Sequence, residues 1–291
     1  MGNKTSKKAR TSQLPGFKTI DDNYYSISEV QDALHEAGLE TSQLVIGVDC
    51  TKSNTWNGKK TFAGKCLHHI GYSHNPYQQV IDILGRTLEP FDDDKLIPVF
   101  GFGDKTTKNK TVFPFNPDLT PCYRSAGVLQ RYNEIIPGIE LSGTTNFAPM
   151  INTAIDIVRI TGEYHILVII TDGQVDQVAD QIATRRAIVE ASEYPLSIII
   201  VGVGDGPWEE MEHYDDELPQ RRFDNLQFVD FHKVMTKQRV EDYDAEFAKN
   251  ALMEIPIQYK LIKQLGLLSN VAKGKPVYGL YTQAPTAPPA Y

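Results

Sequence analysis

Short, continuously apolar runs alternate with stretches of helical spacing along most of this chain of 291 residues. Residues 44–49, L-V-I-G-V-D, form the first run and end in an acid, which is typical of a strand buried on both faces. Further runs lie at 96–102, 165–171, 196–203 and 227–231. Helical periodicity is found at 26–37, 77–88, 126–136, 147–159, 179–191, 244–253 and 256–265. A repeated order of strand, helix and strand implies parallel pairing with right-handed crossovers. We therefore predict an α/β fold with a doubly wound, mostly parallel sheet flanked by helices on both faces, which is a Rossmann-like arrangement.

The composition divides the chain into three parts. Residues 1–23 are polar and basic and are expected to form a flexible arm, residues 24–268 carry the folded domain, and residues 269–291 are rich in proline, glycine, threonine and alanine and are expected to be disordered. The net charge of −8 argues against nucleic acid as the main partner. Three scattered cysteines, Cys50, Cys66 and Cys122, support neither a disulfide framework nor a structural zinc site. A reducing, intracellular setting fits best, and no apolar run is long enough to span a membrane.

Polar side chains follow the predicted strands at the edge where an open parallel sheet binds ligands. The first run ends in a D-x-T-x-S pattern with Asp49, Thr51 and Ser53, and the run at 165–171 is followed by Asp172. A further loop, S-G-T-T-N at 142–146, offers more hydroxyls. Carboxylate and hydroxyl oxygens suit Mg²⁺, Mn²⁺ or Ca²⁺ rather than zinc, with at least one position left for water or for a partner's carboxylate. The alternative is that these residues only cap helices and form turns.

These motifs together resemble the metal-ion-dependent adhesion site of von Willebrand factor A domains. The segments D-C-T-K-S-N, N-P-Y-Q-Q-V-I, L-I-P-V-F-G-F-G-D, G-T-T-N-F-A-P, V-I-I-T-D-G-Q, V-G-V-G-D-G-P-W and A-L-M-E-I-P-I-Q-Y-K look like the copine A domain, most of all the version in the plant copine-like RING ubiquitin ligases. The resemblance runs over residues 20–268.

The resemblance implies a set of metal ligands. Thr145 matches the family's middle threonine because it directly precedes N-F-A-P, with Thr144 as the alternate, and Thr51 stands where a serine is common. The ligands implied are Asp49, Thr51, Ser53, Thr145 and Asp172, with the last acid acting through water. The cation expected is Mg²⁺ or Ca²⁺, and a protein ligand is expected to supply a carboxylate to it.

The sequence also departs from these relatives. Only about forty residues precede the first strand, so the two membrane-binding C2 domains of copines are not expected here. A RING needs about eight paired Cys and His ligands, and three cysteines cannot supply them, so we expect no enzyme in this chain. The G-V-G-D-G-P-W segment lacks dinucleotide-binding spacing, and we expect a tight turn with Pro207 at the first position of a helix. His68, His69 and His74 are expected to be loop or packing residues.

The first residues, M-G-N-K-T-S, fit the pattern for myristoylation of Gly2. One acyl chain binds membranes only marginally, and the lysines that follow would add attraction to an anionic membrane surface. The alternative is an unmodified, disordered basic segment.

The last residues combine two short peptide motifs. Pro285, Thr286, Ala287 and Pro288 resemble the P-T-A-P ligand of the ESCRT-I complex. The segment from Pro288 through Pro289 to Tyr291 matches the P-P-x-Y ligand of WW domains, which bind polyproline segments in aromatic grooves. The alternative is an inert linker.

Together these features predict a non-enzymatic, divalent-metal-dependent adaptor that links a membrane-associated A domain to ubiquitin or ESCRT machinery. The alternative is a component of a ubiquitin ligase, as in the RING-bearing relatives. The location expected is cytoplasmic, peripheral on the plasma membrane or endosomes, with the nucleus as an alternative.

Overall fold

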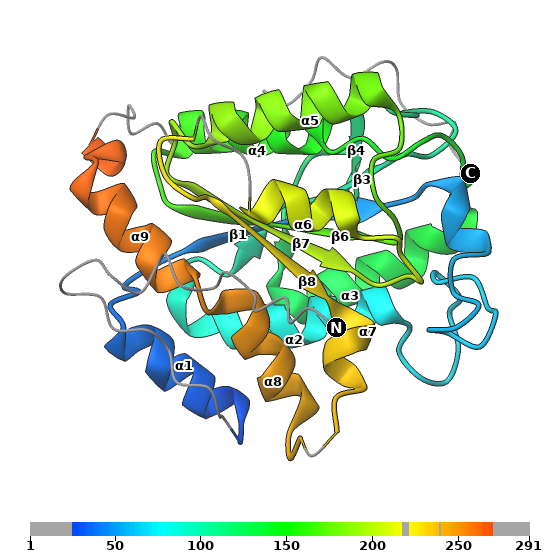
Figure 1. Ribbon diagram of the computed structural model, residues 1–291, viewed down its shortest axis with the longest axis horizontal. Helices are drawn as coiled ribbons and strands as arrows, with labels where there is room; N and C mark the ends of the chain where they lie inside the picture. The colour runs from blue at the N-terminus through cyan, green and yellow to red at the C-terminus, as the bar shows by residue number, and fades with distance from the viewer. Residues whose placement is uncertain (1–24, 217–220, 239, 270–291) are drawn as a thin grey trace, which may run out of the picture.

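Six strands form one sheet in the order β4-β3-β1-β6-β7-β8 (Figure 1). The computed structural model describes residues 25–216, 221–238 and 240–269. The strands are β1 Gln43–Asp49, β2 Leu96–Ile97, β3 Val99–Phe102, β4 Val112–Pro114, β5 Cys122–Tyr123, β6 His165–Thr171, β7 Leu196–Gly202 and β8 Leu226–Asp230. All neighbours in the six-stranded sheet pair in parallel except β3 and β4. The predicted doubly wound, mostly parallel sheet is confirmed.

The α-helices pack on both faces of this sheet. They are α1 Ile27–Glu36, α2 Pro76–Leu88, α3 Arg124–Ile135, α4 Ala148–Thr161, α5 Val178–Ala191, α6 Glu209–Asp216, α7 Phe231–Met235, α8 Tyr243–Leu252 and α9 Ile255–Gln264. Seven of them match the helical stretches expected from the sequence, α6 begins two residues after the helix start expected at Pro207, and α7 was not expected. None of the helices in the described ranges is both long and apolar enough to cross a membrane.

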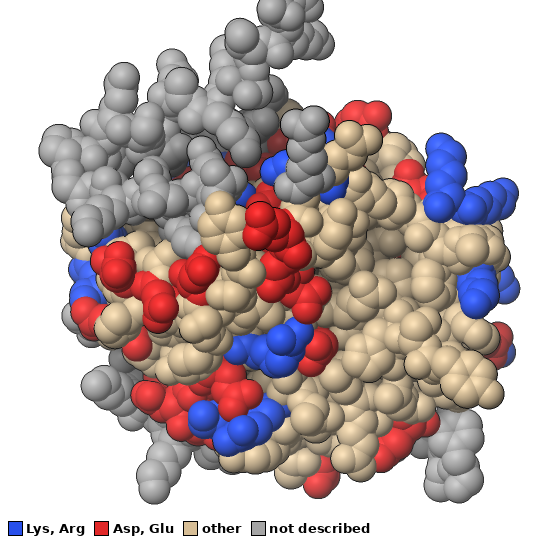
Figure 2. Space-filling model, turned by 90° about the horizontal axis from the view of Figure 1, so that it is seen from below, with Lys and Arg blue, Asp and Glu red and all other residues tan. Residues whose placement is uncertain are grey.

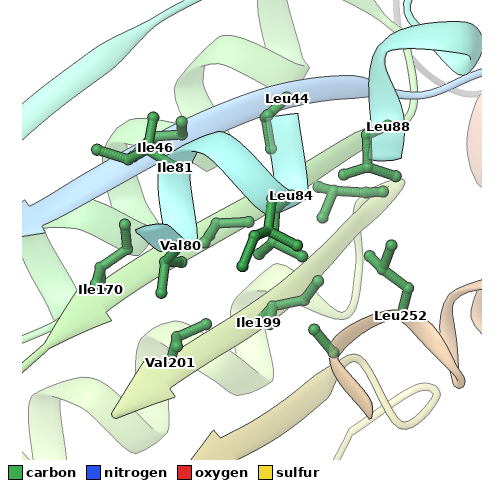
Figure 3. Packing of buried hydrophobic residues seen from close by; sticks show 14 of the residues in the cluster. Leu44, Ile46, Val80, Ile81, Leu84, Leu88, Ile170, Ile199, Val201 and Leu252 are labelled. Carbon is green, nitrogen blue, oxygen red and sulfur yellow. The ribbon is translucent and has the colours of Figure 1, made fainter. Parts of the chain in front are cut away.

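Alternate side chains of each central strand enter one of two cores. On one face, Leu44 and Ile46 of β1 and Ile170 of β6 pack with Val80 and Leu84 of α2 (Figure 3). On the other face, residues of the same strands pack against α4, α5 and α6. Burial on both sides explains why the strands read as unbroken apolar runs.

The run expected at 96–102 is interrupted at Pro98. A proline has no backbone N–H for a ladder hydrogen bond, and the chain there divides into β2 and β3. β2 pairs antiparallel with β5 in a separate two-stranded sheet, while the Pro98 carbonyl still accepts from the Ile46 N–H at 3.0 Å. The segment at 105–122, for which the sequence shows no apolar run or helical period, contains β4, an edge strand that ends in Pro114.

The chain order places a topological switch point at the carboxyl end of β1. β3 and β6 flank β1 on its two sides. α2, which follows β1, packs in one core, and α5, which follows β6, packs in the other. The loops after β1 and β6 therefore leave the sheet in opposite directions, and this is the point where open α/β sheets bind ligands.

Candidate metal centre

The Asp49 carboxylate ties its own loop to the end of the neighbouring strand. It is fully buried at the last position of β1. Its Oδ1 accepts from the Thr51 N–H at 2.8 Å, and its Oδ2 accepts from the Thr171 hydroxyl at 2.6 Å. The loop then turns through a short 3-10 helix at Lys52–Thr55, which brings the Ser53 hydroxyl to within 3.0 Å of the Thr51 hydroxyl.

The Asp172 carboxylate meets the same hydroxyls from the end of β6. Its Oδ1 accepts from the Ser53 hydroxyl at 3.0 Å, the Thr51 hydroxyl at 3.3 Å and the Asn54 amide at 3.2 Å. Its Oδ2 is buried and has no hydrogen-bond partner among the described residues. The structure thus brings together four of the five predicted ligands, Asp49, Thr51, Ser53 and Asp172.

These two carboxylates accept hydrogen bonds only from neutral groups within the described part of the chain. Burial raises the pKa of Asp49, and burial together with the negative charge of Asp49 raises the pKa of Asp172 well above its usual range. Two buried acids with raised pKa values and no positive partner are typical of functional sites, because a cation can offset their charge.

Thr145 lies in a loop that is bonded to the first one. The Ser142 carbonyl accepts from the Lys52 N–H at 2.9 Å, and the Ser142 N–H donates to the Cys50 carbonyl at 3.3 Å. Thr145 is buried, whereas Thr144 is exposed and its hydroxyl lies 3.5 Å from Asp180 Oδ2. In the described residues, no hydrogen bond joins Thr145 to the other four predicted ligands, so its place in the ligand set stays a prediction.

A buried polar cluster supports Asp49 from behind. Two donors, the Asn54 amide at 3.2 Å and His68 Nε2 at 2.8 Å, bind the Asp49 carbonyl oxygen, and the Tyr77 hydroxyl lies 3.2 Å from it. The Tyr77 hydroxyl also lies 2.7 Å from Asn54 Oδ1, and the His68 and Tyr77 rings stack at 4.1 Å. Sequence reasoning did not assign this role, although Asn54 and Tyr77 stand within the motifs D-C-T-K-S-N and N-P-Y-Q-Q.

His68 is a packing residue, as expected. Burial lowers the pKa of His68 to about 4, so the ring is neutral at neutral pH. A carbonyl can only accept, so Nε2 carries the proton toward Asp49, and Nδ1 accepts from the Tyr132 hydroxyl at 2.6 Å. His69 and His74 are exposed.

The G-V-G-D-G-P-W segment, the turn after β7, lies next to Asp172 and to the loop after β1. The Asp205 carboxylate accepts from the backbone N–H groups of Lys60 and Thr61, at 3.0 and 2.9 Å. The Asn57 amide, from the same loop as Lys60, donates to the Asp172 carbonyl. The tight turn was predicted, but Pro207 does not begin a helix: it follows a cis peptide bond, and α6 starts at Glu209.

The donor set decides which cations fit. Among the described residues, no group of three or more His, Cys, Asp or Glu side chains is placed to hold a metal ion. The site offers two carboxylates and neutral hydroxyls instead, together with the buried Asp172 oxygen that lacks a partner. Oxygen ligands of this kind fit Mg²⁺, Mn²⁺ or Ca²⁺ and do not fit a zinc site.

The family model described as Copine matches residues 66–271. This chain belongs to the copine family. The resemblance found in the sequence motifs is thereby confirmed.

Several copine-like proteins are similar over most of the chain. The E3 ubiquitin-protein ligase RGLG5 of Arabidopsis thaliana is 52% identical over 87% of this chain and 61% of its own length. RGLG4 of the same plant is 48% identical over 94% of this chain and 70% of its own length. Copine family protein 2 of Caenorhabditis elegans is 50% identical over 90% of this chain, which covers 3% of that protein. The chain therefore spans less than two thirds of RGLG5.

Solved structures show more distant similarity to this copine-family chain. The match to the VWA domain of SpRpn10 covers 65% of this chain and 87% of the SpRpn10 chain, with 12% identity and a TM-score of 0.46. A von Willebrand factor type A structure from Catenulispora acidiphila has 17% identity and a TM-score of 0.42, over 72% of this chain and 43% of its own.

Proposed function

We propose that this chain is a non-enzymatic adaptor whose A domain binds a divalent cation and, through it, a carboxylate of a protein partner. The observation that carries the proposal is the buried Oδ2 of Asp172, which has no hydrogen-bond partner in the described part of the chain, on a carboxylate bound by the hydroxyls of Thr51 and Ser53. Membership of the copine family supports a protein-binding role.

The residues of the site would divide the work. Asp49 holds the loop after β1 against Thr171, and the Thr51 and Ser53 hydroxyls keep oxygen lone pairs free after donating to Asp172. Thr145 would add a hydroxyl from the loop at 142–146. Mg²⁺ and Ca²⁺ both suit these oxygens. When bound, the cation would supply the positive charge that the two carboxylates lack and an open position for a partner's carboxylate.

Calorimetric titration of the chelator-treated full chain with Mg²⁺ and with Ca²⁺ tests the cation. We expect Asp49→Ala to abolish binding while circular dichroism shows an intact fold. Asp32→Ala, an exposed acid on α1, is the matched control and should bind as wild type does. A wild-type chain that binds neither cation would refute the metal-dependent part of the proposal.

Binding of protein partners should depend on the bound cation. Affinity purification with Mg²⁺, with chelator and with Asp49→Ala should recover a set of proteins only from the first sample. An unchanged set in all three would mean that the domain binds partners in another way.

The two ends of the chain lie outside the described residues, and their roles are also proposals. Myristoylation of Gly2 with the basic residues after it would hold the protein at anionic membranes, on the plasma membrane or endosomes. The motif Pro285–Thr286–Ala287–Pro288 would bind ESCRT-I, and the overlapping motif ending at Tyr291 would bind WW domains. Mass spectrometry of the native N-terminus tests the first. The proteins lost on deletion of residues 283–291 test the second.

A role as a component of a ubiquitin ligase is the second candidate, because the Arabidopsis relatives are named E3 ubiquitin-protein ligases. A reconstituted ubiquitination assay separates the two. An adaptor should need an added ligase, such as a WW-bearing HECT enzyme. Ubiquitin transfer by the purified chain with only E1 and E2 enzymes would favour the second candidate.

A further inference from the structure

Two loops that border the metal centre carry an unusual concentration of lysines for an acidic protein. The loop after β1 has Lys52, Lys59, Lys60 and Lys65, and the loop between β3 and β4 has Lys105, Lys108 and Lys110. All seven are exposed. Only Lys105 forms an ion pair with a described residue, Glu140, at 2.8 Å. The other six lysines of these two loops form no salt bridge with a described residue, in a chain of net charge −8.

The hydrogen bonds of these loops hold the lysines close to the ligands. The loop after β1 is fixed to the site by Asn57, which donates to the Asp172 carbonyl, and by Asp205, which accepts from the Lys60 N–H. The loop between β3 and β4 begins at Asp104, which accepts from the Thr107 N–H at 2.8 Å, and its Lys105 N–H donates to the Glu140 carbonyl at 3.0 Å. The basic charges therefore lie on ordered backbone.

Acids lie beside both lysine-bearing loops, because the Lys60 N–H donates to Asp205 in the turn before α6 and the Asn109 amide donates to Asp180 near the start of α5. The loop after β6 exposes Asp176, and the start of α6, which follows β7, exposes Glu209. Glu210 is already paired with Arg185 at 2.6 Å. Figure 2 shows one face of the molecule, on which Lys and Arg lie at the right-hand margin and also among Asp and Glu in the centre and on the left. The loop after β1 lies on the right-hand side of Figure 1.

One large aromatic side chain stands among the lysines. Trp56 is 50% exposed in the loop after β1, three residues after Ser53. Half-exposed tryptophan next to a polar site is a frequent anchor in protein recognition.

We propose that the loops after β1 and β3 form a docking surface for an acidic peptide segment of a partner. One carboxylate of that segment would reach the cation, and its neighbouring acids would lie along the lysines beside Trp56. This inference rests on the proposed metal-dependent function and adds to it the class and the direction of the ligand.

The acids beside the lysines favour a peptide over an anionic membrane. A bilayer presents a broad negative surface that would meet Asp176 and Glu209 as well as the lysines, and like charges repel. A single extended segment can follow the lysines alone. Its acids would steer it there, and this attraction should weaken as salt rises.

Fluorescence polarisation with a labelled peptide in which glutamate alternates with alanine tests the surface, using the Mg²⁺-loaded full chain. We expect binding of this peptide and none of its glutamine counterpart. Lys59→Glu with Lys65→Glu should weaken binding about tenfold at low salt, because two exposed charges reverse. Arg186→Glu with Lys233→Glu makes the same change of charge elsewhere and should have little effect.

Calorimetric measurement of cation binding by the same variants distinguishes failure of the peptide surface from failure of the metal site. Intact cation binding in the Lys59/Lys65 variant with lost peptide binding supports the inference. If wild type binds the cation but not the glutamate peptide, the inference is wrong and the metal site stands. Peptide binding that persists in chelator would also overturn it, as would lysine-dependent binding to phosphatidylserine vesicles in place of the peptide.

Discussion

The Asp180 carboxylate holds two loops beside Thr145. It is buried on α5 and accepts from the Asn109 amide at 3.0 Å and from the Asn146 amide at 3.2 Å. Asn146 in turn accepts from the Ala148 N–H at 3.0 Å, at the start of α4. Asp180 is therefore a positioning residue for the loop that carries Thr145, and it is not among the proposed metal ligands.

We expect Asp180→Asn to lower the free energy of unfolding by about 1–3 kcal/mol, because amide groups would face each other in a buried network. Urea unfolding measures this, and cation titration should show weaker binding. Asp176→Asn, an exposed acid in the preceding loop, is the control. Equal stability of the two variants would mean that Asp180 does not organise the loop.

A substitution at Tyr77 tests whether the buried polar cluster of Asn54, His68 and Tyr77 stabilises the position of Asp49. Tyr77→Phe removes the hydroxyl that lies 2.7 Å from Asn54 Oδ1 and leaves that buried oxygen without this donor. We expect a loss of about 1–2 kcal/mol of stability and a lower cation affinity. Tyr72→Phe, on a fully exposed ring, should change neither quantity. A cation affinity unchanged in Tyr77→Phe would show that the cluster supports the fold alone.

The turn after β7 approaches the site so closely that only glycine fits at one position. A Cβ at Gly204 would lie 2.3 Å from the Asp172 carbonyl oxygen, which is backbone and cannot rotate away. Gly204→Ala should therefore push the turn off Asp172 and cost about 1–3 kcal/mol. Thermal unfolding measures the loss. Gly71→Ala, whose new Cβ would make only ordinary contacts, is the control, and a Gly204→Ala protein as stable as this control would contradict the expectation.

The strands β1, β3, β6, β7 and β8 and seven helices could be predicted because each buries a regular apolar pattern, whereas β4 and β5 are too short to show one. A helix was expected to begin at Pro207, but the bounds of α6 could not be predicted because only Met211 and Tyr214 of its eight residues are buried hydrophobic side chains, too few to show a period. The split at Pro98 was readable from the missing N–H, but the pairing of β2 with β5 depends on contacts distant in sequence.

The acids and hydroxyls of the candidate site could be predicted because they follow strands directly, and the sheet brings strand ends together. The residues behind them could not. His68 reaches Asp49 only after the loop that follows β1 folds back on the strand end, and Asp180 reaches Asn146 only after α5 packs beside α4 on one face of the sheet. Neither residue has a local pattern that distinguishes it from a loop histidine or a helical acid.

The stability of the whole molecule should depend on pH through a histidine remote from the site. His165 is buried at the start of β6, and its Nδ1 lies 3.0 Å from the Glu163 carbonyl. Burial lowers the pKa of His165 to about 4, from 6.5 in the unfolded chain. The unfolded state therefore binds a proton first as pH falls. The stabilisation from the neutral ring is complete above pH 6.5 and is lost progressively as pH falls toward 4.

We expect this one group to cost about 2 kcal/mol of folding free energy between pH 7 and pH 5. The buried acids act in the other direction, because raised pKa values of Asp49 and Asp172 favour the folded state as pH falls. Comparison with a variant isolates the histidine: urea unfolding of His165→Gln should show a smaller loss from pH 7 to 5 than wild type. His35→Gln, on the exposed side of α1, should keep the wild-type slope. If wild type and His165→Gln lose stability equally over this interval, the protonation of His165 is not what destabilises the fold in acid.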